Sequence, residues 1–499
     1  MRTMVPWALV LAACSSDPGG ACPPVNLEGR RLPERADLAL ERVYAVARGP
    51  MLAEVGGLSG ALSPGAGLKV GGRALTADAH GRFQVQLEAA VGDAVSIQTD
   101  ARPDLETALT VRDATVARAA MVSPRWGGAG SAPNDLAFAG DRLLLVRSGD
   151  AALSALPLGH GADDCGQGLR FSSNGAVAAD PWFVAVDGGR AFVSDFRLDR
   201  VVEVELDSMS TTISFQDPRP LLLDQAWTLA CPSDIDGDGA QETEVQAFTP
   251  RAPQALAVLG GRLFVGMTGF HRARNGDCPP VFLPSVLLSY AADQPEEPPL
   301  RLRLPLQNPQ EIRVGAGGVL IVVCSGELDQ GSGAPRPETD GGLVYVDPVR
   351  LEVLRTVPLG RFAPGSVLEA EGRSFVSSLV KAEVVALSAS GSEDARFHLN
   401  SEAVDSIFRL VEGPGGLILA PSFDSDRLHV IDPVLLVQDG APFFGPIPLG
   451  PGRPLFSGLQ ILARRPGRPG LDFVGPDYVA LLGIASELVA IDTLKVLGP

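Results

Sequence analysis

The apolar residues of this chain fall into short runs and not into long helical faces. One unit recurs: an alternating apolar and polar run that opens at a proline, a turn that contains glycine, and a second run that is apolar throughout. Alternation is typical of a strand with one buried face, and a continuous apolar run is typical of a strand packed on both faces. Copies open at Pro133, Pro181, Pro253, Pro309 and Pro364, with weaker copies at Ile407 and Gly458.

A third apolar run closes most of these copies. The closing runs are Val201–Leu206, Val286–Tyr290, Leu343–Asp347, Glu383–Leu387, Leu428–Asp432 and Leu488–Asp492. Each copy leaves two apolar faces that only neighbouring copies can bury, so the repeat predicts a β-propeller over residues 116–499, with seven blades. Six or eight blades, or several small β domains, are the alternatives. Thr115–Met121 is a candidate for the last blade's missing outer strand.

The blade step resembles that of the YVTN/NHL-type propellers and the gluconolactonase-like superfamily, in which Pro-x-x-Val-x-Val-x-Gly-x-x-Leu-Phe-Val is common. Before it, Phe83, Val85 and Leu87 alternate after an Asp78–Gly81 turn, which predicts a hairpin. This stretch resembles the small bacterial Ig-like or carboxypeptidase-regulatory-like domains, which implies a β-sandwich spacer at 50–115. The expected fold is therefore all-β, a small sandwich followed by a seven-bladed β-propeller.

The N-terminal stretch has the pattern of an export signal. Arg2 precedes an apolar run that ends in Leu11-Ala12-Ala13-Cys14. The pattern resembles the lipobox of bacterial lipoproteins, which implies a signal peptide at 1–13, lipidation of Cys14 and a flexible linker at 14–49. Ser15 resembles the pattern sorted to the outer membrane, so the expected location is the bacterial cell envelope, periplasmic or surface-exposed. The alternatives are an ordinary secretory signal with a chance cysteine, or a buried N-terminal helix.

The net charge of the chain narrows the classes of partner that it is expected to bind. The formal net charge is −18 and the pI is about 4.8, which disfavours binding to nucleic acid because phosphates are repelled. The same surface is compatible with cations. The expected partners are the membrane, through the N-terminal lipid, and a protein or glycan.

One acidic loop, near residues 231–245, has the spacing of a calcium site. Carboxylates at alternate positions converge when the chain turns tightly, and a following carbonyl and Glu add oxygen ligands. The loop resembles those of thrombospondin type-3, dockerin-like or FG-GAP repeats, while Val245 at the twelfth position excludes an EF-hand proper. We expect a structural Ca²⁺; a solvated acidic loop is the alternative. The predicted ligands are Asp234, Asp236, Asp238, Ala240 and Glu242.

Six cysteines occur, and lipidation of Cys14 leaves five for other roles. An odd number requires a free or intermolecular thiol. Cys231 and Cys278 both fall in polar loops of one region and are predicted to pair as a disulfide. Cys324 lies in an apolar run and is predicted to be a buried free thiol.

No catalytic motif of the common hydrolase, zinc-protease or phosphate-loop type occurs. Polar residues do cluster at the openings of the blades, where they either cap strand ends or line a site at the funnel. The favoured hypothesis is a non-enzymatic binding or scaffold module, with no catalytic residue assigned. The alternative is a calcium-dependent hydrolase or lactonase at the funnel, as the resemblance implies. The residues concerned are Asn134, Asp135, Gln254, Gln310, Glu311, Ser366, Asp405 and Ser406.

Overall fold

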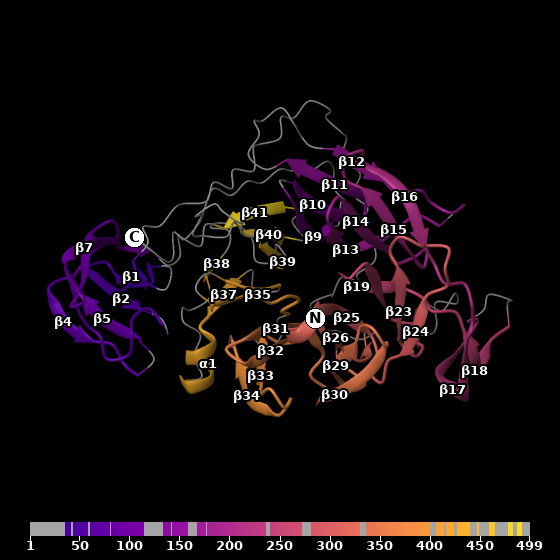
Figure 1. The fold of residues 1–499 in the computed structure, drawn as a ribbon. Coiled ribbons are helices and arrows are strands. Elements are labelled where there is room, and N and C mark those ends of the chain that lie inside the picture. The colour runs from indigo at the N-terminus through magenta and orange to yellow at the C-terminus, as the bar shows by residue number, and fades with distance from the viewer. Residues whose placement is uncertain are drawn as a thin grey trace, which may run out of the picture.

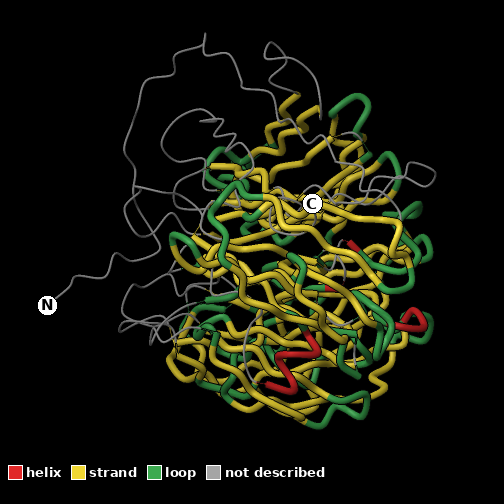
Figure 2. The backbone as a smooth tube through the Cα atoms, turned by 90° about the vertical axis from the view of Figure 1, so that its left-hand side faces the viewer, coloured by secondary structure: helices red, strands yellow, loops and turns green. Residues whose placement is uncertain are grey.

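The computed structural model is almost entirely β-strand in the part of the chain that it describes (Figure 2). A 3-10 turn (Ala316–Gly318) and one α-helix, α1 (Pro433–Asp439), are its helical elements there. No helix in the described part is long and apolar enough to cross a membrane. The described residues run from 35 to 491, with gaps at 41–42, 58–59, 80, 114–132, 141, 158–166, 176, 236–239, 272–280, 330–335, 400–405, 414–415, 424–426, 440–446, 449–458, 465–477 and 483–486.

In the described part of the chain from residue 133 onward, seven antiparallel sheets of three or four strands follow one another (Figure 1). Each of the first three has four strands. Blade 1 comprises β9 (Pro133–Ala139), β10 (Arg142–Arg147), β11 (Ala152–Pro157) and β12 (Gln167–Arg170). Blade 2 comprises β13 (Pro181–Asp187), β14 (Arg190–Asp195), β15 (Arg200–Glu205) and β16 (Ser210–Phe215). Blade 3 comprises β19 (Pro253–Leu259), β20 (Arg262–Met267), β23 (Val286–Ala291) and β24 (Leu300–Arg303).

The remaining sheets complete the ring. Blade 4 comprises β25 (Pro309–Val314), β26 (Leu320–Cys324), β29 (Gly341–Asp347) and β30 (Glu352–Gly360). Blade 5 comprises β31 (Pro364–Ala370), β32 (Arg373–Ser378), β33 (Glu383–Leu387) and β34 (Glu393–His398). Blade 6 comprises β35 (Val411–Glu412), β36 (Ile418–Ser422), β37 (Arg427–Ile431) and β38 (Ile447–Pro448), and blade 7 comprises β39 (Leu459–Arg464), β40 (Tyr478–Leu482) and β41 (Glu487–Ile491).

The innermost strands close the ring. β9 contacts both β13 and β39, so the first and last blades lie side by side (Figure 1). The predicted propeller is confirmed, and the seven sheets agree with the expected seven blades. Thr115–Met121, the expected fourth strand of blade 7, lies outside the described residues. The opening strand of blade 6 is shorter than the sequence predicts, because pairing begins only at Val411.

The second strand of each blade packs on both faces, as its continuous apolar pattern predicts. On β14, Ala191 and Val193 pack with residues of blade 1, while Phe192 between them packs with residues of blade 3. Phe264 on β20 likewise packs against blade 4. Successive side chains of a strand point to opposite faces, so one apolar run serves two blade interfaces.

The two faces of the ring differ. First and second strands are joined on one face by tight turns, such as the one at Gly188, which has a φ of 59°. The opposite face, where the innermost strands begin, carries three additional hairpins in the part of the chain that the structure describes. These are β17 (Leu221–Ser233) with β18 (Glu242–Phe248), β21 (Phe270–His271) with β22 (Val281–Phe282), and β27 (Leu328–Asp329) with β28 (Arg336–Pro337).

The N-terminal unit consists of two four-stranded sheets around one core, which agrees with the expected sandwich. The first sheet has the order β5 (Phe83–Leu87), β2 (Leu52–Gly57), β1 (Val43–Gly49) and β8 (Arg112–Asp113). The second has the order β4 (Arg73–Thr76), β3 (Gly67–Val70), β6 (Ala94–Thr99) and β7 (Arg102–Thr110).

Two details of this unit differ from the expectation. Leu38 and Leu40 lie in its core and β1 pairs with β2, so the folded unit begins well before residue 50, where the linker was expected to end. The predicted hairpin around Asp78 is wrong, because β4 pairs with β3 whereas β5 pairs with β2. The chain therefore crosses between the two sheets at this turn, which both alternating runs allow.

Candidate functional site

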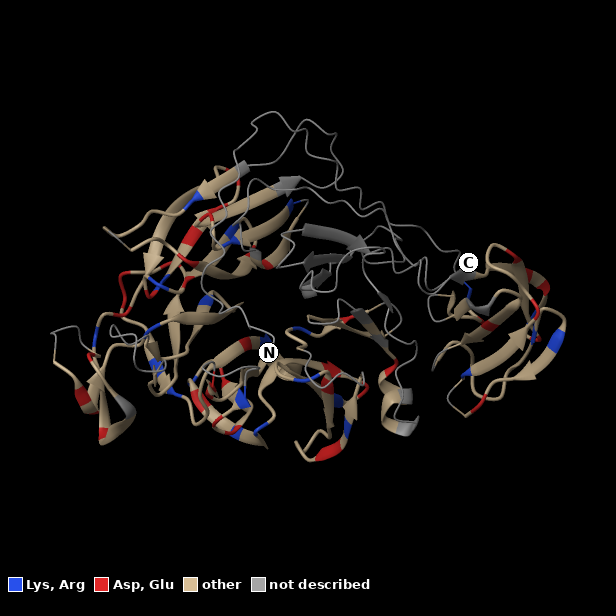
Figure 3. Ribbon diagram, turned by 180° about the vertical axis from the view of Figure 1, so that it is seen from behind, with Lys and Arg blue, Asp and Glu red and all other residues tan. Residues whose placement is uncertain are grey.

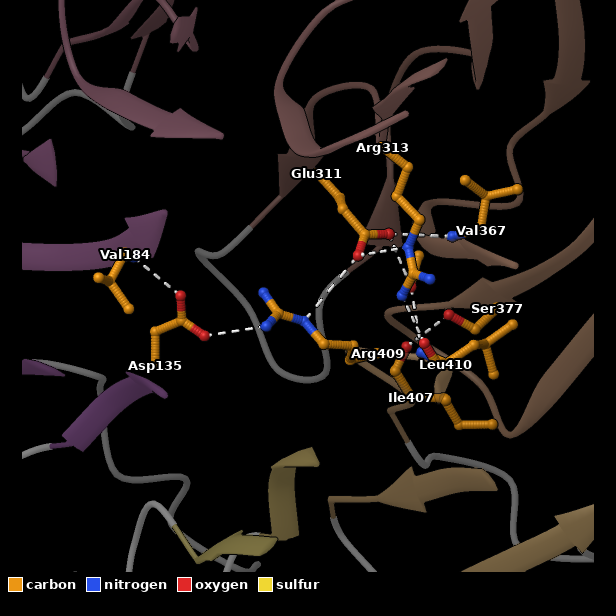
Figure 4. A network of polar contacts seen from close by, with 10 residues as sticks. Asp135, Val184, Glu311, Arg313, Val367, Ser377, Ile407, Arg409 and Leu410 are labelled. Atoms are coloured by element: carbon orange, nitrogen blue, oxygen red, sulfur yellow. Dashed lines mark hydrogen bonds and ion pairs between the residues drawn. The ribbon is translucent and has the colours of Figure 1, made fainter. Parts of the chain in front are cut away.

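The central channel brings together residues that hold the same position in different blades. Asp135, Phe183, Glu311 and Ser366 each lie two residues after the proline that opens an innermost strand. Arg409 comes from the segment just before β35 and extends between Asp135 and Glu311 (Figure 4). Charged residues of both signs also lie on the outer strands of the blades (Figure 3).

The guanidinium of Arg409 contacts residues of three blades, namely blades 1, 2 and 4. Its Nη1 donates to Oδ1 of Asp135 at 3.0 Å, and its Nε lies 3.9 Å from Oε1 of Glu311. Its guanidinium also lies 6.0 Å from the centre of the Phe183 ring. The Asp135 side chain is 2% exposed and that of Arg409 is 20% exposed, so little water screens this pair.

The two carboxylates have a second task, which is to cap the backbone of the next blade. Oδ2 of Asp135 accepts the N–H of Val184 at 2.9 Å, and Oε2 of Glu311 accepts the N–H of Val367 at 3.1 Å. Val184 and Val367 each follow the opening proline by three residues, where the strand register shifts. A bulge of this kind leaves an N–H outside the ladder, and a buried N–H needs an acceptor.

Burial and charge act in opposite directions on this network. Burial raises the pKa of Asp135, although the Arg409 charge and the Val184 N–H both favour the carboxylate. Burial lowers the pKa of Arg409, but the charges of Asp135 and Glu311 outweigh it and raise that pKa. Each group thus depends on its partners to stay charged in a site with little solvent.

Other contacts extend the same pattern around the channel. Oδ1 of Asp199 accepts the N–H of Ala252 at 2.8 Å, linking blades 2 and 3, and burial raises the pKa of Asp199 to about 6. Between blades 3 and 4, Oγ of Ser285 accepts the N–H of Asn308 at 2.8 Å. Polar side chains thus join successive blades on this face.

Most of the polar residues expected at the blade openings act as caps or bridges. Asn134 donates to the carbonyl of Pro181 at 3.4 Å, and Gln254 donates to Gln310 at 2.6 Å. Oγ of Ser366 donates to Glu311 at 2.7 Å. The backbone carbonyl of Ser406 accepts the N–H of Phe423, whereas Asp405 lies outside the described residues. Among the residues that the structure describes, no three His, Cys, Asp or Glu side chains gather as a metal site.

Sequence reasoning missed Arg409, Asp199 and Asn308. Arg409 lies in the weakest of the mid-chain copies, where no opening proline marks its position. Asp199 and Asn308 both have a positive φ, of 52° and 59°, and Asp and Asn are the residues that tolerate this region best. A polar residue of this kind just before a proline, as in Asn308-Pro309, is a signal that was available.

The acidic loop forms the tip of the β17–β18 hairpin. Ser233 pairs with Glu242, and Oε2 of Glu242 accepts the N–H of Ile235 at 2.9 Å, so this side chain folds back over the turn. The carbonyl of Asp234 lies 3.0 Å from Nε2 of His271. Ala240 is exposed, and Asp236 and Asp238 lie outside the described residues.

The described residues test the cysteine predictions at one position. Cys324 is free and fully buried in β26, as predicted, and burial raises its pKa. Cys14 and Cys278 lie outside the described residues, as does the side chain of Cys231. Lipidation and the Cys231–Cys278 disulfide therefore stay predictions.

Solved structures share the architecture. The chain is similar to hydrazine synthase from Kuenenia stuttgartiensis, with a TM-score of 0.50 and 12% identity over 74% of this chain and 97% of that chain. It is also similar to virginiamycin B lyase from Staphylococcus aureus, with a TM-score of 0.48 and 9% identity over 72% of this chain and 95% of that chain.

A third similar structure is the β-propeller domain of Cps50 (Swd1) from Myceliophteria thermophila, with a TM-score of 0.46 and 10% identity over 74% of this chain and 97% of that chain. The chain adopts the β-propeller fold. At these identities the likeness concerns the fold alone, since one propeller architecture supports many functions. No family model and no curated protein sequence matches the chain.

Proposed function

We propose that this chain is an exported, lipid-anchored β-propeller that acts as a non-enzymatic binding or scaffold module at the cell envelope. The observation that carries the proposal is the Asp135–Arg409–Glu311 bridge. A calcium-dependent hydrolase at the funnel needs carboxylates that converge on a cation. Here the two channel carboxylates converge on a guanidinium and on backbone N–H groups of the next blade.

The unequal faces support a binding role. All three additional hairpins extend from the face where the innermost strands begin, whereas the described first-to-second turns of the other face are short. Loops and hairpins on a rigid scaffold are where binding surfaces concentrate. The lipobox-like Leu11-Ala12-Ala13-Cys14 supports the anchor, and a protein or glycan is the expected partner.

We further propose that Ca²⁺ orders the tip of the β17–β18 hairpin. The fold-back of Glu242 over Ile235 supports this, because it places a carboxylate beside the turn that starts at Asp234. Asp234, Asp236, Asp238 and Glu242 would hold the ion through carboxylate oxygens, and Ala240 through its carbonyl. The ion would stabilise the hairpin and take no part in chemistry.

Two experiments test the proposed function, one on the lipid anchor and one on the absence of catalysis. A fatty-acid probe should label the wild type and not Cys14→Ser, and labelling of that variant would contradict the anchor. The purified protein should show no lactone or ester hydrolysis above background, with calcium or with chelator. Calcium-stimulated hydrolysis that Asp135→Asn abolishes, while Asp224→Asn on the hairpin leaves it intact, would establish the funnel hydrolase instead.

A further inference from the structure

A groove of about 440 Å³ lies on the hairpin-bearing face between blades 3 and 4. A volume of this size is typical of a ligand site. Its walls come from the β17–β18 hairpin, from the ends of blade 3 and from the outer strand of blade 4. The residues that define it are Trp227, Pro284, Arg303, Pro305, Val353 and Thr356.

The hairpin that supplies Trp227 is firmly attached to blade 3. Asp217, just before the hairpin, accepts bonds from Nε of Arg219 at 2.7 Å and from Nε of Arg301 at 2.6 Å. Arg301 also donates to the carbonyls of Arg219 and Pro220. Trp227 itself packs against the apolar core of this region and is half-buried. Its ring is thus held rigidly at the groove, which limits the entropy lost when a ligand binds.

An exposed arginine lines the groove. Arg301 and Arg303 lie on the same strand, but of these two side chains only that of Arg301 has a hydrogen bond or ion pair within the described residues; Arg303 is exposed at the groove wall. The chain carries a formal net charge of −18, and the exposed Arg303 guanidinium places a positive charge at the groove. A guanidinium beside an indole favours an anion attached to an apolar body, with the carboxylate bound by the fork of the arginine.

The strand that borders the groove favours a peptide. β30 is the outermost strand of its sheet, so its outer edge pairs with no other strand in the described part. Val353 and Leu354 on this strand are 37% and 56% exposed. An extended peptide can add to such an edge through its backbone while its side chains enter the adjacent groove.

We propose that this groove binds a segment of a partner protein that places an aromatic or aliphatic side chain beside an Asp or Glu. The apolar side chain packs on Trp227 and the carboxylate pairs with Arg303. The inference rests on the proposed binding role and specifies the surface and the chemistry of the partner.

A random peptide library displayed on phage, selected on the intact protein, provides the probe. Enriched peptides should carry an apolar residue next to Asp or Glu. Synthetic versions should bind Arg303→Glu at least about tenfold more weakly than the wild type in a fluorescence anisotropy titration. Arg350→Glu is the matched control, because Arg350 is exposed in the turn between β29 and β30 of blade 4 and is not one of the residues that line the groove.

A second variant tests the volume of the groove without unpairing a buried group. Tyrosine is a residue that strands favour, and in Thr356→Tyr its ring fills the groove from the exposed side of β30. This variant should therefore also abolish binding. Enrichment of peptides without an acidic residue, equal binding to Arg303→Glu, or no enrichment would overturn the groove proposal. None of these results would be evidence for hydrolysis at the channel. The groove proposal can therefore fail while the proposed function stands.

Discussion

Arg409 donates a hydrogen bond to Asp135 at 3.0 Å although 274 positions separate the two residues in the chain. The bond joins the segment before blade 6 to the innermost strand of blade 1. Because Asp135 also caps Val184 of blade 2, one guanidinium and one carboxylate connect three blades across the ring. The channel of this propeller is therefore organised as a structural connection.

Removal of the guanidinium should destabilise the ring. Arg409→Met leaves Asp135 in a poorly solvated site without its cation, whereas Glu311 keeps its pair with Arg313 at 3.0 Å. We expect a loss of about 3 kcal/mol in the free energy of unfolding. Urea denaturation followed by circular dichroism measures it. Arg373→Met is the control: its pair with Asp394 is 38% and 32% exposed, so the loss should stay below about 1 kcal/mol.

The double variant Asp135→Asn/Arg409→Met separates a lost attraction from a stranded charge. Asn keeps an acceptor for the Val184 N–H and removes the charge. We expect the double variant to be more stable than Arg409→Met alone. A double variant that is less stable, by the sum of the two single losses, would contradict this account.

Asp217 predicts a specific loss of stability in acid. Burial raises its pKa, but the hydrogen bonds from Arg219 and Arg301 prevail and lower the pKa from 3.8 to about 2. A lowered pKa contributes stability that is present above the unfolded value and is lost as the pH falls through the folded value, here between about 4 and 2. The contribution is at most about 2 kcal/mol.

The measurement is the difference in urea midpoint between the wild type and Asp217→Asn as a function of pH. The difference should be constant above pH ~5 and should shrink towards pH ~2. Taking the difference removes the titration of other carboxyl groups. A difference that does not change with pH would show that Asp217 is neutral, or unpaired, in the folded protein.

Glu371 occupies a turn that its side chain disfavours. Glu371 and Gly372 join β31 to β32 with φ values of 48° and 70°, and the corresponding turn of blade 3 has Gly260. A two-residue turn with both φ values positive favours Asn followed by Gly. Glu371→Asn should raise the free energy of unfolding by about 1 kcal/mol. Glu371→Gln removes the same charge without this preference, so an equal gain for Gln would assign the effect to charge.

Much of the propeller was predictable because its signal is local. An alternating run, a glycine turn and a uniform apolar run correspond to β13 and β14, and the uniform run reflects the contact of Phe192 with one neighbour and Val193 with the other. This pattern needs no knowledge of distant contacts. The polar residues at the blade openings, such as Asp135 and Glu311, could be predicted for the same reason.

The partner of each carboxylate was not predictable. Asp135 and Glu311 stand out as charges in strand openings, but nothing near them in sequence indicates that Arg409 lies between them. In the N-terminal unit, β4 and β5 have the pattern of a hairpin, yet they belong to different sheets because the pairing with β2 and β3 decides. Long-range pairing prevails over local pattern in both cases.

Cys324 should be protected from alkylation in the folded state. Its side chain is fully buried and burial raises its pKa, so the thiolate is scarce and out of reach. Iodoacetamide at pH ~8 should label Cys324 only after denaturant is added. Mass spectrometry of the peptide that contains Cys324 measures the labelling. Labelling of the native protein at the rate of the unfolded chain would show that β26 opens readily.

The calcium proposal is tested on the acidic loop itself. Asp236→Ala should lower the melting temperature in calcium-containing buffer and change it little in chelator, because only the ion-bound hairpin loses a ligand. Asp224→Ala removes an exposed carboxylate on β17 of the same hairpin and should melt like the wild type in both buffers. If the wild type melts at the same temperature with calcium and with chelator, the loop is a solvated acidic turn. In that case the fold-back of Glu242 over Ile235 suffices to hold the hairpin tip.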